Sequence, residues 1–65
     1  MIDDIDIYRA AKLLVDRHGV EAREHASSRI TSMEGSGDDV GAAAWRQIAA
    51  AIEVLLTDTH EGPLN

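Results

Sequence analysis

The sequence predicts an all-α fold, a small unit of three helices in a single domain. The first observation is compositional: 45% of the 65 residues are hydrophobic, but the only aromatic residues are one Trp and one Tyr. A core built from aliphatic side chains and alanine favours helices over a β-sandwich. The second observation is spacing, because apolar residues recur at intervals of three and four along three segments, about 3–18, 20–34 and 38–57. The third is that glycines separate these segments.

Residues 3–18 begin with a helix-start pattern. With Asp3 at the N-cap, Asp6 falls at the third helical position, a short version of the capping box. Carboxylates in a first turn also interact favourably with the positive end of the helix dipole. Gly19 follows the last apolar position, so we expect it to end this helix in the left-handed conformation.

Residues 20–34 form the weakest of the three predicted helices. The apolar stripe is narrow, and the segment contains three serines and a threonine, whose side chains compete for backbone hydrogen bonds. We therefore expect this helix to depend on its neighbours. The stretch Gly35-Ser36-Gly37 should then break the chain.

Residues 38–57 give the strongest helical pattern, and either Asp38 or Asp39 is expected to cap it. The polar stretch 58–65 ends in turn-forming residues, so it is predicted to be a flexible, disordered tail. The predicted organisation is thus one helical domain over residues 1–57 followed by that tail.

Short connections between helices favour antiparallel neighbours, so we expect the three helices to run up, down and up. All three should contribute to one core. Its predicted members are Ile7, Tyr8, Ala11, Leu14, Val15, Ala26, Ile30, Met33, Trp45, Ile48, Ile52 and Leu55.

Two aliphatic residues fall outside this core pattern. Leu13 lies on the polar side of the first segment, and Val54 lies on the polar side of the third, in line with Ala43, Gln47 and Ala50. Single exposed aliphatic side chains are ordinary in soluble proteins. The alternative is a second apolar surface, used for self-association as a homodimer or for a partner helix.

The sequence gives little support for metal binding. Without cysteine, there can be no disulfide framework and no thiolate zinc site. His18, Glu21 and His25 come nearest to a set of metal ligands, but Gly19 interrupts the helix between them and no HExxH pattern is present. We expect ordinary histidines there, with no metal and no cofactor.

Catalysis has equally little support. The serines of the second segment lack the strand–turn–helix context of a nucleophile elbow. The glycine-rich stretch 35–39 lacks the lysine of a phosphate-binding loop and places two aspartates where an anion would bind. The chain is therefore predicted not to be an enzyme.

The charge balance is the most informative functional feature. Twelve acidic residues face six basic ones, for a net charge of −6, which is the opposite sign from a nucleic-acid binder. In an up-down-up unit, the start of the first helix and the turn before the third lie at one end. Six acidic residues would then gather at that end: Asp3, Asp4, Asp6, Glu34, Asp38 and Asp39. Their carboxylates either serve only as helix caps or form an acidic surface that docks on a basic protein surface.

Two motifs resemble those of a family of short uncharacterised bacterial helical proteins. The first is Ile7-Tyr8-Arg9-Ala10-Ala11 with His18-Gly19-Val20-Glu21-Ala22, and the second is Gly41-Ala42-Ala43-Ala44-Trp45-Arg46-Gln47-Ile48. The resemblance covers most of residues 5–56 and implies a helical unit, without a binding or catalytic residue to carry over. In size, acidity and helicity the chain also resembles small phage inhibitors such as anti-CRISPR proteins, some of which are acidic DNA mimics.

Location and function follow as expectations. No run approaches the roughly 20 apolar residues of a membrane span, and the acidic N-terminus does not look like a signal peptide, so we expect a cytoplasmic protein. The predicted function is non-catalytic binding to a basic surface of a protein partner, for example as an anti-CRISPR-like inhibitor of a nucleic-acid-binding complex, without direct nucleic-acid or membrane binding. A self-associating structural helical module is the alternative.

Overall fold

The computed structural model describes residues 4–61, and throughout that range its regular elements are helical, with no strand. The predicted all-α class is therefore confirmed. The elements are helix α1 (Asp4–His18), a single 3₁₀ turn η1 (Gly19–Glu21), helix α2 (Ala22–Gly35) and helix α3 (Asp39–Glu61).

The first half of the chain is one bent helical run rather than two separate helices. α1 passes into η1 and η1 into α2 without an intervening coil residue, so residues 4–61 contain two helical runs, 4–35 and 39–61, where the sequence predicted three helices. Gly19 has the expected left-handed conformation, with φ +60°. This single residue bends the chain, and the helical turns resume directly after it.

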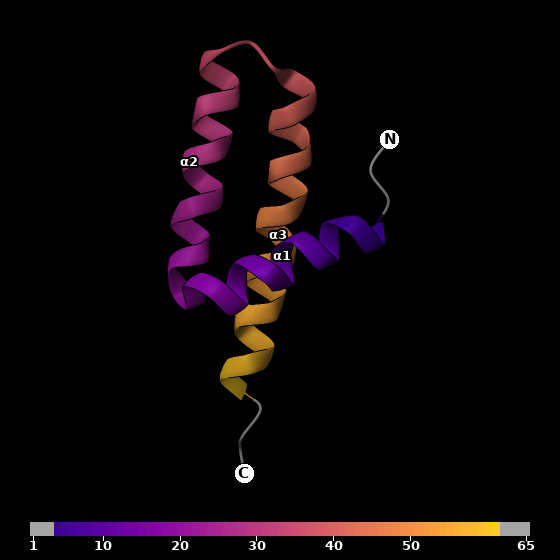
Figure 1. Cartoon of the computed structure of the whole chain (residues 1–65), viewed down its shortest axis with the longest axis vertical. Coiled ribbons are helices and arrows are strands. Elements are labelled where there is room, and N and C mark those ends of the chain that lie inside the picture. Colours follow the sequence, from indigo (N-terminus) through magenta and orange to yellow (C-terminus); the bar gives the residue numbers. More distant parts are fainter. Residues whose placement is uncertain (1–3, 62–65) are drawn as a thin grey trace.

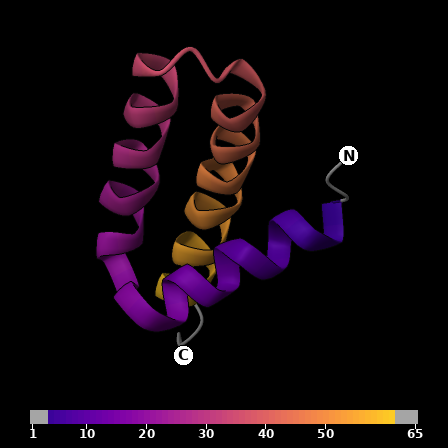
Figure 2. The same ribbon diagram turned by 45° about the horizontal axis from the view of Figure 1, so that its top comes forward.

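α2 and α3 form a helical hairpin, and α1 crosses it. α2 and α3 lie side by side, and α1 extends across α3 (Figures 1 and 2). α1 packs mainly against α3 and touches α2 only near their junction. The expected up-down-up arrangement is therefore wrong. The physical reason is that α1 continues into α2 through a helical turn without a loop, so the two helices meet at an angle and α1 reaches α3 instead (Figure 1).

The turn between α2 and α3 is built around Asp38. Gly37 has φ +79°, and the Asp38 N–H donates to the Met33 carbonyl at 2.8 Å, which closes α2 in the manner of a Schellman motif. The Asp38 carboxylate then accepts a hydrogen bond from the Gly41 N–H at 2.8 Å and caps α3. Of the two candidate caps, Asp38 is therefore the one used, and Asp39 is the first helical residue.

The core is narrow and rich in alanine. Most of the predicted core residues are buried or half-buried, but Tyr8 is 50% exposed. Tyr8 was predicted wrongly because α1 rests on one helix, so only a narrow stripe of its surface is covered. Ile52 is the only large side chain described as fully buried. The buried residues are Ile7, Ala11, Ala22, Ala26, Ala42, Ile48 and Ile52.

Helix α3 is longer than predicted. It continues to Glu61, past the expected end at residue 57, because no helix breaker occurs before Gly62 and Pro63. The predicted flexible tail, 58–65, therefore begins as helix, and its last four residues lie outside the described part of the chain.

Candidate functional site

The acidic residues singled out from the sequence fall into two separate groups. Asp4 and Asp6 lie in the first turn of α1, whereas Glu34, Asp38 and Asp39 lie around the turn between α2 and α3. The start of α1 lies to the side of the hairpin, away from that turn (Figures 1 and 2). The expected single acidic end is therefore absent, because α1 crosses α3. Asp3, the sixth residue of the set, lies outside the described residues.

Two of these carboxylates already have intramolecular partners. Asp38 caps α3 through the Gly41 N–H, and Glu34 forms an ion pair with Arg46 of α3. The carboxylates of Asp4, Asp6 and Asp39 are exposed. Among the described side chains of residues 4–57 none of these three has an ion-pair partner, so they are the members of the set best placed to meet a partner.

Three ion pairs join described side chains, and they engage Lys12, Arg23 and Arg46. Lys12 and Asp16 lie 3.6 Å apart on α1, Arg23 Nε lies 2.6 Å from Glu53 Oε2 across the α2–α3 interface, and Arg46 pairs with Glu34. All six side chains are about half exposed. Such pairs each contribute only about 0–1 kcal/mol to stability. Each pair cancels one positive and one negative charge, so the net charge of −6 belongs to the side chains outside these pairs.

The rings of His18 on α1, His25 on α2 and Trp45 on α3 lie together at the corner of the fold. The rings of His18 and His25 stack with centroids 5.2 Å apart and planes inclined by 14°. His25 in turn lies 5.8 Å from the Trp45 ring. The seven-residue separation of the histidines was visible in the sequence, but the contact of His25 with Trp45 depends on how α2 packs on α3. Over the described residues, no three His, Asp or Glu side chains converge as metal ligands.

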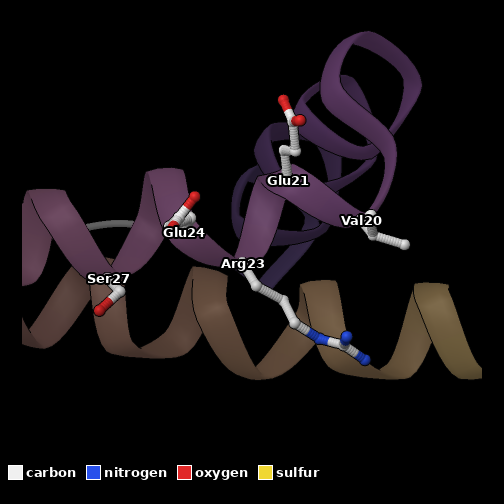
Figure 3. Close-up of a pocket in the computed structure, with 5 residues that line it drawn as sticks. All are labelled: Val20, Glu21, Arg23, Glu24 and Ser27. Atoms are coloured by element: carbon white, nitrogen blue, oxygen red, sulfur yellow. The ribbon is translucent and has the colours of Figure 1, made fainter.

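An open hollow lies on the outer surface of η1 and α2 (Figure 3). Val20, Glu21, Arg23, Glu24 and Ser27 line it. The side chains diverge: Glu21 points away from α3, whereas Arg23 extends along it (Figure 3) and is paired with Glu53. No set of polar groups converges on a common point, so the hollow has the character of open surface.

Several aliphatic side chains are exposed. Leu13 is 52% exposed and Val54 58%, so their predicted positions outside the core are confirmed. The sequence did not lead us to expect the exposure of Ile5, Val20 or Val40, the last of which is 81% exposed. Val40 continues the line of Ala43, Gln47, Ala50 and Val54, and that spacing was the signal that could have revealed it.

Helix α3 is more apolar than the sequence reasoning allowed. Its segment Asp39–Thr57 has a mean hydropathy of 1.2 and is long and apolar enough, by length and composition alone, to cross a membrane. The core helix of a soluble protein passes the same test when most of it is buried. Here only 17% of the segment is buried, so much of an apolar helix is uncovered.

Comparison with known proteins returned no match to a protein family, to a curated protein or to a solved structure. Function must therefore be inferred from the chain's own residues. The usable features are the exposed carboxylates, the ring cluster at the corner and the uncovered face of α3.

Proposed function

We propose that this chain is a small, non-catalytic binding protein that docks its exposed carboxylates on a basic surface of a protein partner. The observation that carries the proposal is the charge balance. Twelve acidic residues face six basic ones, and three of those basic side chains are engaged in intramolecular ion pairs. The remaining field is negative, and such a field accelerates and orients association with a positively charged surface.

Asp4, Asp6 and Asp39 are the carboxylates best suited to this role. All three are exposed, and each belongs to the first turn of a helix. A first-turn carboxylate also stabilises its own helix, which is the alternative explanation for these residues. Glu34 and Asp38 lie with Asp39 around the turn between α2 and α3, but both also hold the fold together, so they are unsuitable for the test.

The chemistry of the partner follows from the charge. A basic patch on a cytoplasmic protein is commonly a nucleic-acid site, because phosphate binding requires Lys and Arg. The most concrete form of the proposal is therefore an inhibitor that occupies the nucleic-acid site of a partner complex. This form agrees with the general resemblance to small acidic phage inhibitors.

The test compares two variants with the same change in net charge. The first is Asp4→Asn, Asp6→Asn and Asp39→Asn. The control is Asp16→Asn, Glu21→Gln and Glu24→Gln, which removes three charges elsewhere. When immobilised, the wild-type chain and the control should both capture the same protein from a cell lysate. Added nucleic acid or salt should release that protein, and the first variant should fail to capture it. Circular dichroism should show the same helicity in all three proteins.

The two acidic groups can be tested separately because they lie apart. Asp4→Asn with Asp6→Asn changes only the start of α1, and Asp39→Asn changes only the start of α3. The variant that fails to capture the partner identifies which of the two helix starts contacts it. If the triple variant captures the same protein with the same rates and salt dependence as wild type, these carboxylates serve only their helices and the proposal is wrong.

A further inference from the structure

The outer face of α3 carries a second apolar repeat, opposite the core. Val40, Ala43, Gln47, Ala50 and Val54 follow one another at intervals of three, four, three and four residues, and all five are exposed. This is the seven-residue repeat of a helix that packs along another helix. No described part of the chain covers it.

A second helix fits this face better than a lipid bilayer does. The face includes Gln47, and it is flanked by Arg46 and Glu53, both of which form ion pairs with α2. Burying these groups in hydrocarbon would be costly. At a helix–helix seam, by contrast, charged residues commonly flank the apolar positions and remain in water.

The face is complementary to a second copy of itself in the antiparallel direction. In one register, Gln47 lies opposite the partner's Ala50, and the small Ala43 lies opposite the partner's larger Val54. Because the dimer has two-fold symmetry, each of these pairs occurs twice. In that register Arg46 lies across from the partner's Glu53, and Glu53 from the partner's Arg46. The side chains of Arg46 and Glu53 are each 54% exposed, so both can reach across the seam.

We propose that this chain forms an antiparallel homodimer in which α3 packs against α3 of a second copy. An isologous contact of this kind closes on itself and needs no other component. The shape of the single chain supports it: the radius of gyration is 12.4 Å, against about 11 Å for a compact chain of this length. The core holds one fully buried large side chain, so a second copy would add the apolar burial that one copy lacks.

Sedimentation equilibrium at micromolar concentration tests the dimer. Wild type should have a mass of about 14 kDa, twice the 7.0 kDa of one chain. Ala50→Glu and Val54→Glu should each give a monomer with unchanged helicity, since both residues are exposed in the single chain. The matched control Val20→Glu alters an equally exposed valine in η1 and should remain dimeric, as should Leu13→Glu on α1.

Cross-linking tests the direction of packing, since the chain has no natural cysteine. A mixture of Ala43→Cys and Val54→Cys chains should form a disulfide between unlike chains, whereas Ala43→Cys alone should not. Three results would overturn the proposal: a wild-type monomer throughout, a dimer that Val54→Glu leaves intact, or cross-linking of Ala43→Cys with itself. Binding of a monomer to phospholipid vesicles, abolished by Val54→Glu, would instead assign the face to a membrane.

Discussion

The carboxylate of Asp38 occupies the space that a side chain at Gly41 would need. Asp38 Oδ1 accepts the Gly41 N–H at 2.8 Å, and a Cβ added to Gly41 would lie 2.6 Å from Oδ2 and 2.9 Å from Met33 Sδ. The cap of α3 and the glycine in its first turn therefore depend on each other. They also position the turn that joins α2 to α3.

Gly41→Ala should fail to stabilise the protein. Replacing glycine by alanine within a helix normally gains about 1 kcal/mol, but here the new methyl group displaces the capping carboxylate, and losing a cap costs about 1 kcal/mol. The two effects should cancel or leave a net loss. Gly35→Ala is the control, since an added Cβ there meets nothing within 4 Å, and it should stabilise. Urea unfolding followed by circular dichroism measures both.

The same measurement in an Asp38→Ala background isolates the contact. With the carboxylate removed, only the flexible Met33 side chain still has to move aside, so Gly41→Ala should recover most of the ordinary gain of about 1 kcal/mol from helix propensity. Equal effects of Gly41→Ala in the two backgrounds would show that Asp38 and Gly41 do not interact in solution.

Gly19→Ala should destabilise the bend. Gly19 has φ +60°, with nothing within 4 Å of an added Cβ, so the cost is backbone strain of about 1–2 kcal/mol. In a chain of this size, each kcal/mol lowers Tm by about 4–8 °C. Gly19→Asn should cost less, because asparagine tolerates the left-handed region better. Thermal unfolding checks the order Gly, Asn, Ala, and an unchanged Tm for Gly19→Ala would mean that residues 4–35 do not bend there.

The ion pair between Arg23 and Glu53 should show a small coupling energy. A double-mutant cycle with Arg23→Gln and Glu53→Gln should give about 0.2–1 kcal/mol, because both side chains are half exposed and screened by water. The coupling should fall as salt is added. Lys12 and Asp16, one turn apart on α1 at 3.6 Å, provide a comparison for which about 0.3–0.5 kcal/mol is expected. A coupling energy of zero at low salt would show that Arg23 of α2 and Glu53 of α3 do not contact each other in solution.

Trp45 should report the ring contact at the corner. It is the only tryptophan in the chain, and the His25 ring lies 5.8 Å from it. Removing a ring that packs against an indole changes the surroundings of the fluorophore, so His25→Gln should shift the emission spectrum of Trp45. His18→Gln removes a ring that stacks on His25, so it should shift the spectrum less. A spectrum that His25→Gln leaves unchanged would place the two rings apart.

Local chemistry explains what could be predicted from the sequence. The helical segments follow from apolar spacing, the cap from the aspartates before α3, and the left-handed bend from Gly19 after His18. The exposure of Leu13 and Val54 follows from the same spacing. Each of these features depends on residues within about two helical turns of one another, so neighbouring residues alone contain the information.

The tertiary structure decided how the helical runs lie against each other. α1 crosses α3 instead of folding back along α2, because the chain bends at Gly19 without a loop that would reverse it. The direction of α1 exposes Tyr8 and separates the start of α1, with Asp4 and Asp6, from the turn at Asp38 (Figure 1). The packing of α2 on α3 brings Arg23 to Glu53 and His25 to Trp45. These contacts join residues 20 or more positions apart, and only packing between helices specifies them.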